Sequence, residues 1–159
     1  MYDFKIAAPD TATMYSDLAS ALQGLVTGEP DGIANMANAA ALTWETLPDL
    51  NWAGFYRNVD GELVLGPFQG RPACIRIKFG EGVCGTAAAT QQVQRIDDVH
   101  AFPGHIACDS ASNSELVVPI VRDDELIAVL DLDSPKAARF TIEDEAGCAK
   151  LAEILAKAL

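Results

Sequence analysis

Residues 115–133 read ELVVPIVRDDELIAVLDLD, which is two apolar runs joined by a charged segment. Short runs rich in Val, Ile and Leu are typical of β-strands, and a polar segment between two such runs is typical of a hairpin turn. The stretch therefore predicts two paired strands, Glu115–Val121 and Leu126–Leu132, which turn over residues 122–125. Strands joined by so short a turn run antiparallel, so we expect an antiparallel sheet around this hairpin.

A second hairpin and several helices are expected around the first one. Trp52–Arg57 and Glu62–Leu65 flank Asp60-Gly61, which is a strong turn signal. Shorter strands are expected over residues 73–79 and 93–96. Apolar residues at helical spacing predict helices over residues 11–27, 31–46, 83–91 and 142–159. This order favours an α+β domain, in which a central antiparallel sheet has helices packed on it.

Two of these helices carry more specific expectations. Thr141 is the expected N-cap of the last helix, with Asp144 at the capping-box position. The second helix has an apolar stripe that we expect to face the core. The stripe consists of Ile33, Met36, Ala40 and Trp44.

Length and composition limit the classes of protein. The chain has 159 residues, of which 50% are apolar, so we expect one domain over residues 1–159. Within it we expect N-terminal helices in 1–50, the sheet and site loops in 51–135, and a terminal helix in 140–159. The 23 acidic residues outnumber the 11 basic ones, and the net charge of -12 disfavours nucleic acid and membrane surfaces as partners. No leader pattern and no run of about 18 apolar residues is found, so we expect a cytoplasmic protein.

The chain contains four cysteines, Cys74, Cys84, Cys108 and Cys148. They are too few for a disulfide-stapled scaffold, and Cys148 has the apolar helical neighbours of a core residue. For the other three, packing, metal binding and catalysis are all open from spacing alone. Cys84 lies in the first turn of a glycine-opened helix, where the dipole stabilises a thiolate. Cys108 lies in a long connection, residues 97–113, and connections this long are usually functional or mobile.

A zinc site is the alternative to thiol chemistry, because cysteine thiolates and histidine imidazoles are the usual zinc ligands. The candidate ligands are His100, His105, Cys108 and Cys84. Their spacing matches no compact zinc motif, so we expect no resident metal, and nothing in the sequence indicates another cofactor.

A second group of candidate residues consists of carboxylates. Asp131 and Asp133 alternate with leucines on one strand, so both point to the same face, and Glu115 begins the partner strand. The alternative is a solvated strand end. If the face is covered, crowded carboxyl groups have raised pKa values and either hold a proton for donation or bind an ammonium group. Trp52 and Tyr56 also share a strand face, and core packing is the alternative for them.

Six short stretches carry a resemblance to a known family: NWAGFY (51–56), LGPFQG (65–70), GEGVCG (80–85), GHIACD (104–109), SNSE (112–115) and VLDLDS (129–134). Together they resemble the free methionine-(R)-sulfoxide reductases, which are built on a GAF-type domain. The resemblance covers residues 50–135 and implies a GAF-like fold. Generic GAF domains share the sheet but lack these cysteines together with these carboxylates.

The resemblance implies roles for the cysteines in a thiol-dependent reduction of free L-methionine-(R)-sulfoxide to methionine. Cys108 is similar to the nucleophile, which becomes a sulfenic acid and then condenses with a second thiol into an intramolecular disulfide. By the same likeness Cys74 is the resolving partner, and Cys84 assists recycling or shapes the pocket. Thioredoxin would then reduce the disulfide by exchange.

The resemblance also implies how a free amino acid is selected, since both its charged ends need partners. Asp131, Asp133, Glu115 and Asp97 would divide ammonium binding and proton donation, with no assignment from sequence. The substrate carboxylate would bind the N–H groups of Gly82, Val83 and Gly85, and Trp52 and Tyr56 would contact the thioether methyl. A homodimer is expected only by analogy with the fold, and a GAF-type metabolite sensor is the alternative function.

Overall fold

The structure is a computed structural model that describes residues 10–104 and 110–159. Two residues singled out above, His105 and Cys108, lie outside the described residues. The elements follow in this order: α1 (Thr11–Val26), α2 (Gly32–Thr46), β1 (Trp52–Val59), β2 (Glu62–Gly70), β3 (Arg76–Lys78), α3 (Gly82–Thr90), β4 (Gln94–Ile96), the 3-10 helix η1 (Val99–Ala101), β5 (Ser114–Arg122), β6 (Glu125–Ser134) and α4 (Ile142–Ala156).

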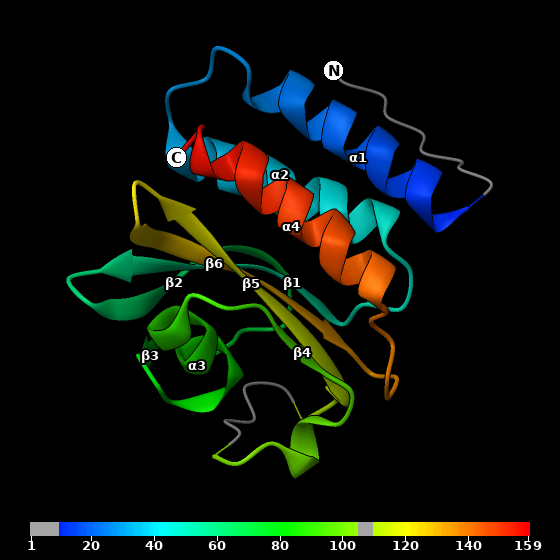
Figure 1. The fold of residues 1–159 in the computed structure, drawn as a ribbon, viewed down its shortest axis with the longest axis vertical. Coiled ribbons are helices and arrows are strands. Elements are labelled where there is room, and N and C mark those ends of the chain that lie inside the picture. The colour runs from blue at the N-terminus through cyan, green and yellow to red at the C-terminus, as the bar shows by residue number, and fades with distance from the viewer. Residues whose placement is uncertain (1–9, 105–109) are drawn as a thin grey trace.

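The strands in the described residues form one antiparallel sheet in the order β3-β2-β1-β6-β5-β4. Helices α2 and α4 cover one face of this sheet, with α1 packed on these two helices, and α3 lies on the other face (Figure 1). Each face has its own apolar cluster, with Phe55 and Leu130 under the three long helices and Tyr56 and Val129 under α3. The predicted α+β fold, an antiparallel sheet with helices packed on it, is confirmed. No helix in the described part of the chain is long and apolar enough to cross a membrane.

Both predicted hairpins are present, and each turns through two residues with positive φ. Asp60 and Gly61 have φ of 53° and 83°, and Asp123 and Asp124 have φ of 52° and 65°. Two such residues in succession give a turn whose twist matches the flanking strands. Two strands are longer than predicted: β2 continues to Gly70, and β6 continues to Ser134. The additional residues of β6 include Asp133, one of the candidate carboxylates.

The predicted third strand, residues 73–79, is too long. Only Arg76–Lys78 is a strand, and it pairs with β2 at the edge of the sheet. The strand ends after Lys78 because the chain turns at residues 79–80, where Gly80 has φ of 87°. The long connection 97–113 also contains η1, which was not predicted.

The predicted stripe of α2 is partly wrong. Ile33 and Trp44 are 46% and 38% exposed, whereas Met36 and Ala40 are buried as expected. The polar Asn35 is buried instead, and its amide donates to the Glu29 and Ala158 carbonyls, both at 3.0 Å. These carbonyls belong to the α1–α2 connection and to the residues that follow α4, so distant backbone groups help to decide which face of α2 is covered.

The start of α4 is confirmed in detail. Thr141 caps the helix and forms the capping box with Asp144. The Asp144 carboxylate also accepts from the Tyr15 hydroxyl at 2.7 Å and pairs with Arg139 at 2.9 Å, which fastens α1 to α4. Cys148 is buried beside Tyr15, with 3.8 Å between sulfur and hydroxyl oxygen, and it packs in the core as predicted.

Candidate active site

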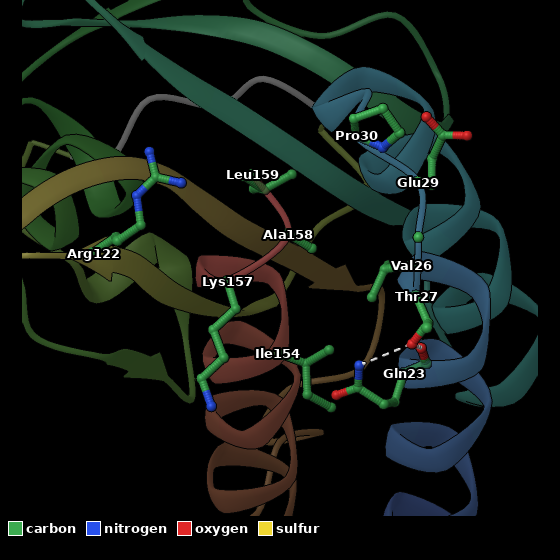
Figure 2. Close-up of a pocket in the computed structure, with 11 residues that line it drawn as sticks. Gln23, Val26, Thr27, Glu29, Pro30, Arg122, Ile154, Lys157, Ala158 and Leu159 are labelled. Carbon is green, nitrogen blue, oxygen red and sulfur yellow. Dashed lines mark hydrogen bonds between the residues drawn. The ribbon is translucent and has the colours of Figure 1, made fainter.

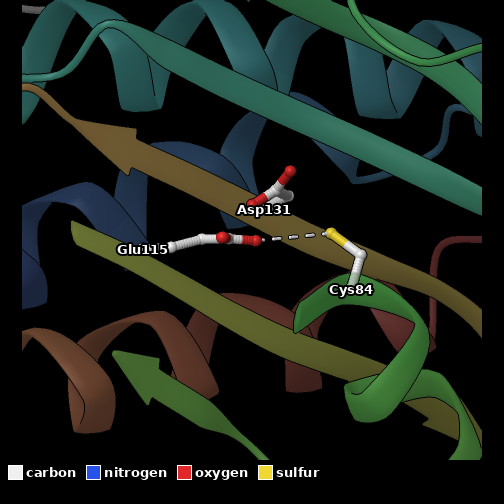
Figure 3. A group of neighbouring side chains, drawn as sticks. All are labelled: Cys84, Glu115 and Asp131. Atoms are coloured by element: carbon white, nitrogen blue, oxygen red, sulfur yellow. Dashed lines mark hydrogen bonds between the residues drawn. The ribbon is translucent and has the colours of Figure 1, made fainter. Parts of the chain in front are cut away.

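Three buried side chains meet on the α3 face of the sheet: Cys84, Glu115 and Asp131 (Figure 3). The Cys84 thiol donates to Glu115 Oε1 at 3.8 Å. One sulfur or oxygen atom from each residue lies within 4.8 Å of the other two. The side chains come from α3, β5 and β6, so the group depends on the tertiary fold and not on local sequence.

Strand register explains why the carboxyl groups converge. Glu115 on β5 lies opposite Asp133 on β6, and Asp131 lies two residues further along the same strand. On the other side of β6, Trp52 is paired with Asp133 and Gly54 with Asp131. Alternate residues of a strand share a face, so the side chains of Glu115, Asp131, Asp133 and Trp52 all project toward α3. The alternative of a solvated strand end does not hold for Glu115 or Asp131, which are 6% and 5% exposed.

The start of α3 places Cys84 over this acidic face. Gly82 has φ of 61°, and Cys84 is the third residue of the helix. Gly85 has no room for a side chain, because a Cβ there would stand 2.3 Å from the Lys78 carbonyl oxygen. The Gly85 N–H donates to the Glu81 carbonyl at 3.0 Å, so the prediction that it binds substrate is not supported. The N–H groups of Gly82 and Val83 belong to the first turn, where donors have no partner inside the helix.

Three stacked aromatic rings form another wall of the site. The Trp52 and Tyr56 centroids are 5.8 Å apart, and those of Trp52 and Phe68 are 5.2 Å apart, with an interplanar angle of 12°. The indole N–H donates to the Arg71 carbonyl at 3.1 Å. Gly54 lets Phe68 approach, since a Cβ on Gly54 would lie 2.3 Å from the Phe68 Cβ. No role was predicted for Phe68 from the sequence. The features that could have indicated one are its place in the LGPFQG stretch and its position opposite Gly54 of β1.

Burial dominates the electrostatics of the group. It raises the pKa of Glu115 well above its ordinary value, and the neighbouring Asp131 and Asp133 charges raise it further. Burial also raises the pKa of Asp131 to about 7, although its contacts with Cys84 and Glu115 act in the opposite direction. Burial is also the largest cause of the raised pKa of Cys84, and the negative charges of these acids raise it further. Burial therefore favours the protonated form of the carboxyl groups in this site.

The other predicted site residues divide into those near the buried group and those apart from it. Asp133 is half-buried and acts as a neighbouring charge on Cys84, Tyr56 and Glu115. The structure does not bring Asp97 into the group: its side chain is 66% exposed and pairs with Arg95 at 3.6 Å.

The remaining cysteine and histidine candidates are placed as follows. Cys74 is disulfide-bonded, whereas Cys84 and Cys148 are free thiols. The exposed His100 has its Nε2 3.0 Å from Asn113 Oδ1. Among the described residues, Cys84 is grouped with Glu115 and Asp131 and not with His100. Two members of the zinc set considered above, His105 and Cys108, lie outside the described residues.

A separate hollow of about 450 Å³ opens between the α1–α2 connection and the end of α4 (Figure 2). The side chains around it include Arg122, Lys157 and Glu29, and the Gln23 amide donates to the Thr27 hydroxyl at 3.3 Å. None of its 11 lining residues is a cysteine. The hollow therefore offers no thiol, in contrast to the α3 face of the sheet.

The fold and the buried thiol–carboxyl group together define a GAF domain with a cysteine-based site, and a GAF domain family model matches residues 33–159. The chain is 56% identical to the free methionine-R-sulfoxide reductase of Escherichia coli over 145 residues, which is 91% of this chain and 88% of the relative. It is 43% identical to the Saccharomyces cerevisiae reductase of the same name over 143 residues, 85% of this chain and 79% of the relative.

A solved structure is similar to this chain over nearly its whole length. It is the free methionine-R-sulfoxide reductase of Neisseria meningitidis in complex with its substrate, 43% identical to this chain, with a TM-score of 0.95. The similarity covers 99% of this chain and 95% of that one. The chain therefore belongs to the GAF-domain family of free methionine-R-sulfoxide reductases, and it is an oxidoreductase. The family assignment made from the six sequence stretches is confirmed.

Proposed function

We propose that this protein reduces free L-methionine-(R)-sulfoxide to L-methionine, with cysteine thiols as electron donors. Support comes from the names of its relatives and from the relative solved with its substrate. The structural observation that carries the proposal is the buried group of Cys84, Glu115 and Asp131, in which burial favours a protonated carboxyl group. A sulfoxide needs such a donor, because its sulfur becomes electrophilic once its oxygen is protonated or hydrogen-bonded.

The chemical step transfers oxygen from the substrate to a cysteine. The Cys108 thiolate attacks the sulfoxide sulfur while the Glu115 carboxyl group donates a proton to the sulfoxide oxygen. Methionine leaves, and the oxygen stays on Cys108 as a sulfenic acid. The substrate sulfur gains two electrons and Cys108 loses two. A second thiol then attacks the sulfenic sulfur, which forms a disulfide and releases the oxygen as water.

Cys74 suits the role of resolving thiol better than Cys84 does. Cys74 is disulfide-bonded in the structure, whereas Cys84 is a free, buried thiol next to Glu115. Burial and neighbouring acids raise the Cys84 pKa, and a thiol with a raised pKa is a poor nucleophile. Cys84 therefore shapes the pocket, and thioredoxin reduces the disulfide in a reducing compartment, which we take to be the cytoplasm.

The remaining groups suit the two charged ends of a free amino acid. Asp131 Oδ1 is buried and has no hydrogen-bond partner among the described residues, and the half-buried Asp133 lies on the same face. These carboxylates bind the substrate ammonium, which methionine inside a peptide lacks. The substrate carboxylate binds the N–H groups of Gly82 and Val83 at the start of α3. Trp52 and Tyr56 contact the methyl and sulfur, since sulfur packs well against aromatic rings.

The experiment is to incubate the purified protein with racemic free methionine sulfoxide and dithiothreitol and to measure the methionine formed. We expect half of the racemate to be consumed and no reduction of methionine sulfoxide inside a peptide. Cys108→Ser should abolish turnover, and Cys74→Ser should allow one reduction per chain without recycling by thioredoxin. Tight binding of the sulfoxide without any methionine would favour a sensor, and full turnover by Cys108→Ser would reject the nucleophile.

A further inference from the structure

The ligand atoms of Cys84, Glu115 and Asp131 lie slightly further apart than ligands around one metal ion. Zinc lies about 2.3 Å from a cysteine sulfur and about 2.1 Å from a carboxylate oxygen, so a tetrahedral ion separates such atoms by about 3.6 Å. The Cys84 sulfur and Glu115 Oε1 are 3.8 Å apart, and one Asp131 oxygen lies within 4.8 Å of both residues' ligand atoms. Small side-chain rotations would therefore bring all three atoms onto one ion.

A second observation also points to a missing cationic partner. Asp131 is 5% exposed, and its Oδ1 has no hydrogen-bond partner among the described residues. Neither Asp131 nor Glu115 takes part in any of the ion pairs found within residues 10–104 and 110–159. Buried carboxyl groups are ordinarily paired or bound to a metal. Figure 3 shows the three side chains converging from α3, β5 and β6.

We propose that Cys84, Glu115 and Asp131 form a binding site for one Zn²⁺ ion, with a water molecule as the fourth ligand. When zinc binds, it displaces the protons of the thiol and of the buried carboxyl groups into solution. The resulting donor set of one thiolate and two carboxylates suits zinc, whereas magnesium and calcium prefer oxygen alone. The net charge of -12 raises the local concentration of cations. The ion is not part of the reductase reaction. If the proposed function holds, zinc occupies the proton donor and the ammonium site, and so blocks the reaction.

The test uses the full-length protein in its disulfide form, in which Cys84 and Cys148 are the free thiols among the described residues. Equilibrium dialysis against Zn²⁺ with elemental analysis gives stoichiometry and affinity, and Co²⁺ in place of Zn²⁺ reports thiolate ligation by its charge-transfer absorption. Cys84→Ser and Asp131→Asn are the test variants. Cys148→Ser is the matched control, because it removes a buried thiol from the opposite face of the sheet.

We expect one zinc ion per chain, a thiolate–cobalt absorption band, and at least about tenfold weaker binding in both test variants. Binding by Cys148→Ser should equal that of the unmodified protein. No bound zinc, unchanged zinc affinity in Cys84→Ser, or a loss confined to Cys148→Ser would each overturn the site. Asp131→Asn keeps the shape of the side chain, so its zinc affinity tests the site if Cys84→Ser fails to fold.

The blocking effect is measured separately, in a single turnover of pre-reduced protein without added thiol. One equivalent of Zn²⁺ should abolish methionine formation, and excess chelator should restore it. Methionine formed at the same rate with zinc bound would refute the blocking effect. If the zinc-free protein forms no methionine, the proposed function fails, while the dialysis experiment still decides the metal site.

Discussion

Replacing Asp131 by asparagine removes a carboxyl group that burial makes hard to ionise. The pKa of this group rises from 3.8 to about 7 in the folded protein. Between these values the folded chain holds a proton that the unfolded chain has released. Stability is therefore lost as pH rises through this window, and the loss is complete above the folded pKa.

The size of the effect follows from the same two pKa values. One pKa unit corresponds to about 1.36 kcal/mol, so the free energy of unfolding of the unmodified protein should fall by about 2 to 3 kcal/mol between pH 5 and pH 8 because of Asp131. Asparagine is neutral throughout this range, so the Asp131→Asn variant does not lose this stability as pH rises. The Asp131 charge also raises the pKa of Glu115. Removing this charge lowers the Glu115 pKa, so the variant loses less stability than the unmodified protein as pH rises.

The assay is urea unfolding of both proteins from pH 5 to pH 8, a range above the sequence pI of about 4.3. The free energy of unfolding of Asp131→Asn, minus that of the unmodified protein, should rise by about 2 to 3 kcal/mol across the range. Asp123→Asn, an exposed acid in the second hairpin turn, is the matched control and should show no such rise. A difference that is flat or falls with pH would refute the account of the buried carboxyl group.

Two further substitutions test packing at named contacts. Gly147→Ala places a Cβ 2.2 Å from the Tyr15 ring and should destabilise the protein by about 1 to 3 kcal/mol in thermal unfolding. Gly24→Ala is the control, because nothing lies within 4 Å of its Cβ; a Gly147→Ala protein as stable as this control would contradict the packing. Phe68→Ala removes the ring stacked on Trp52 and should raise KM for the sulfoxide about two- to tenfold, with kcat changed less. An unchanged KM in steady-state assays would show that Phe68 does not position Trp52.

The hairpins and the start of α4 were predictable because their signals are local. A two-residue turn between β-rich runs, and a threonine followed three residues later by an acid, act through neighbouring backbone atoms. The exposure of Ile33 and Trp44 was not predictable, because the face of α2 is fixed in part by carbonyl groups at Glu29 and Ala158.

The candidate site was predictable in part for the same reason. Even spacing placed Asp131 and Asp133 on one face, and the hairpin placed Glu115 beside them. The contact between Cys84 and Glu115 needed the position of α3 over the sheet, which no local pattern contains. The position of Asp97 was also beyond local pattern, since its pairing with Arg95 leaves it outside the buried group.

The most direct test of the proposed reaction is a single turnover by the fully reduced protein. Free L-methionine-(R)-sulfoxide is added without external reductant, and the methionine formed per chain is counted while mass spectrometry maps the new disulfide. The account predicts one methionine per chain together with one disulfide that joins Cys74 to Cys108. Formation of methionine with Cys74 and Cys108 still reduced, or no methionine at all, would contradict it.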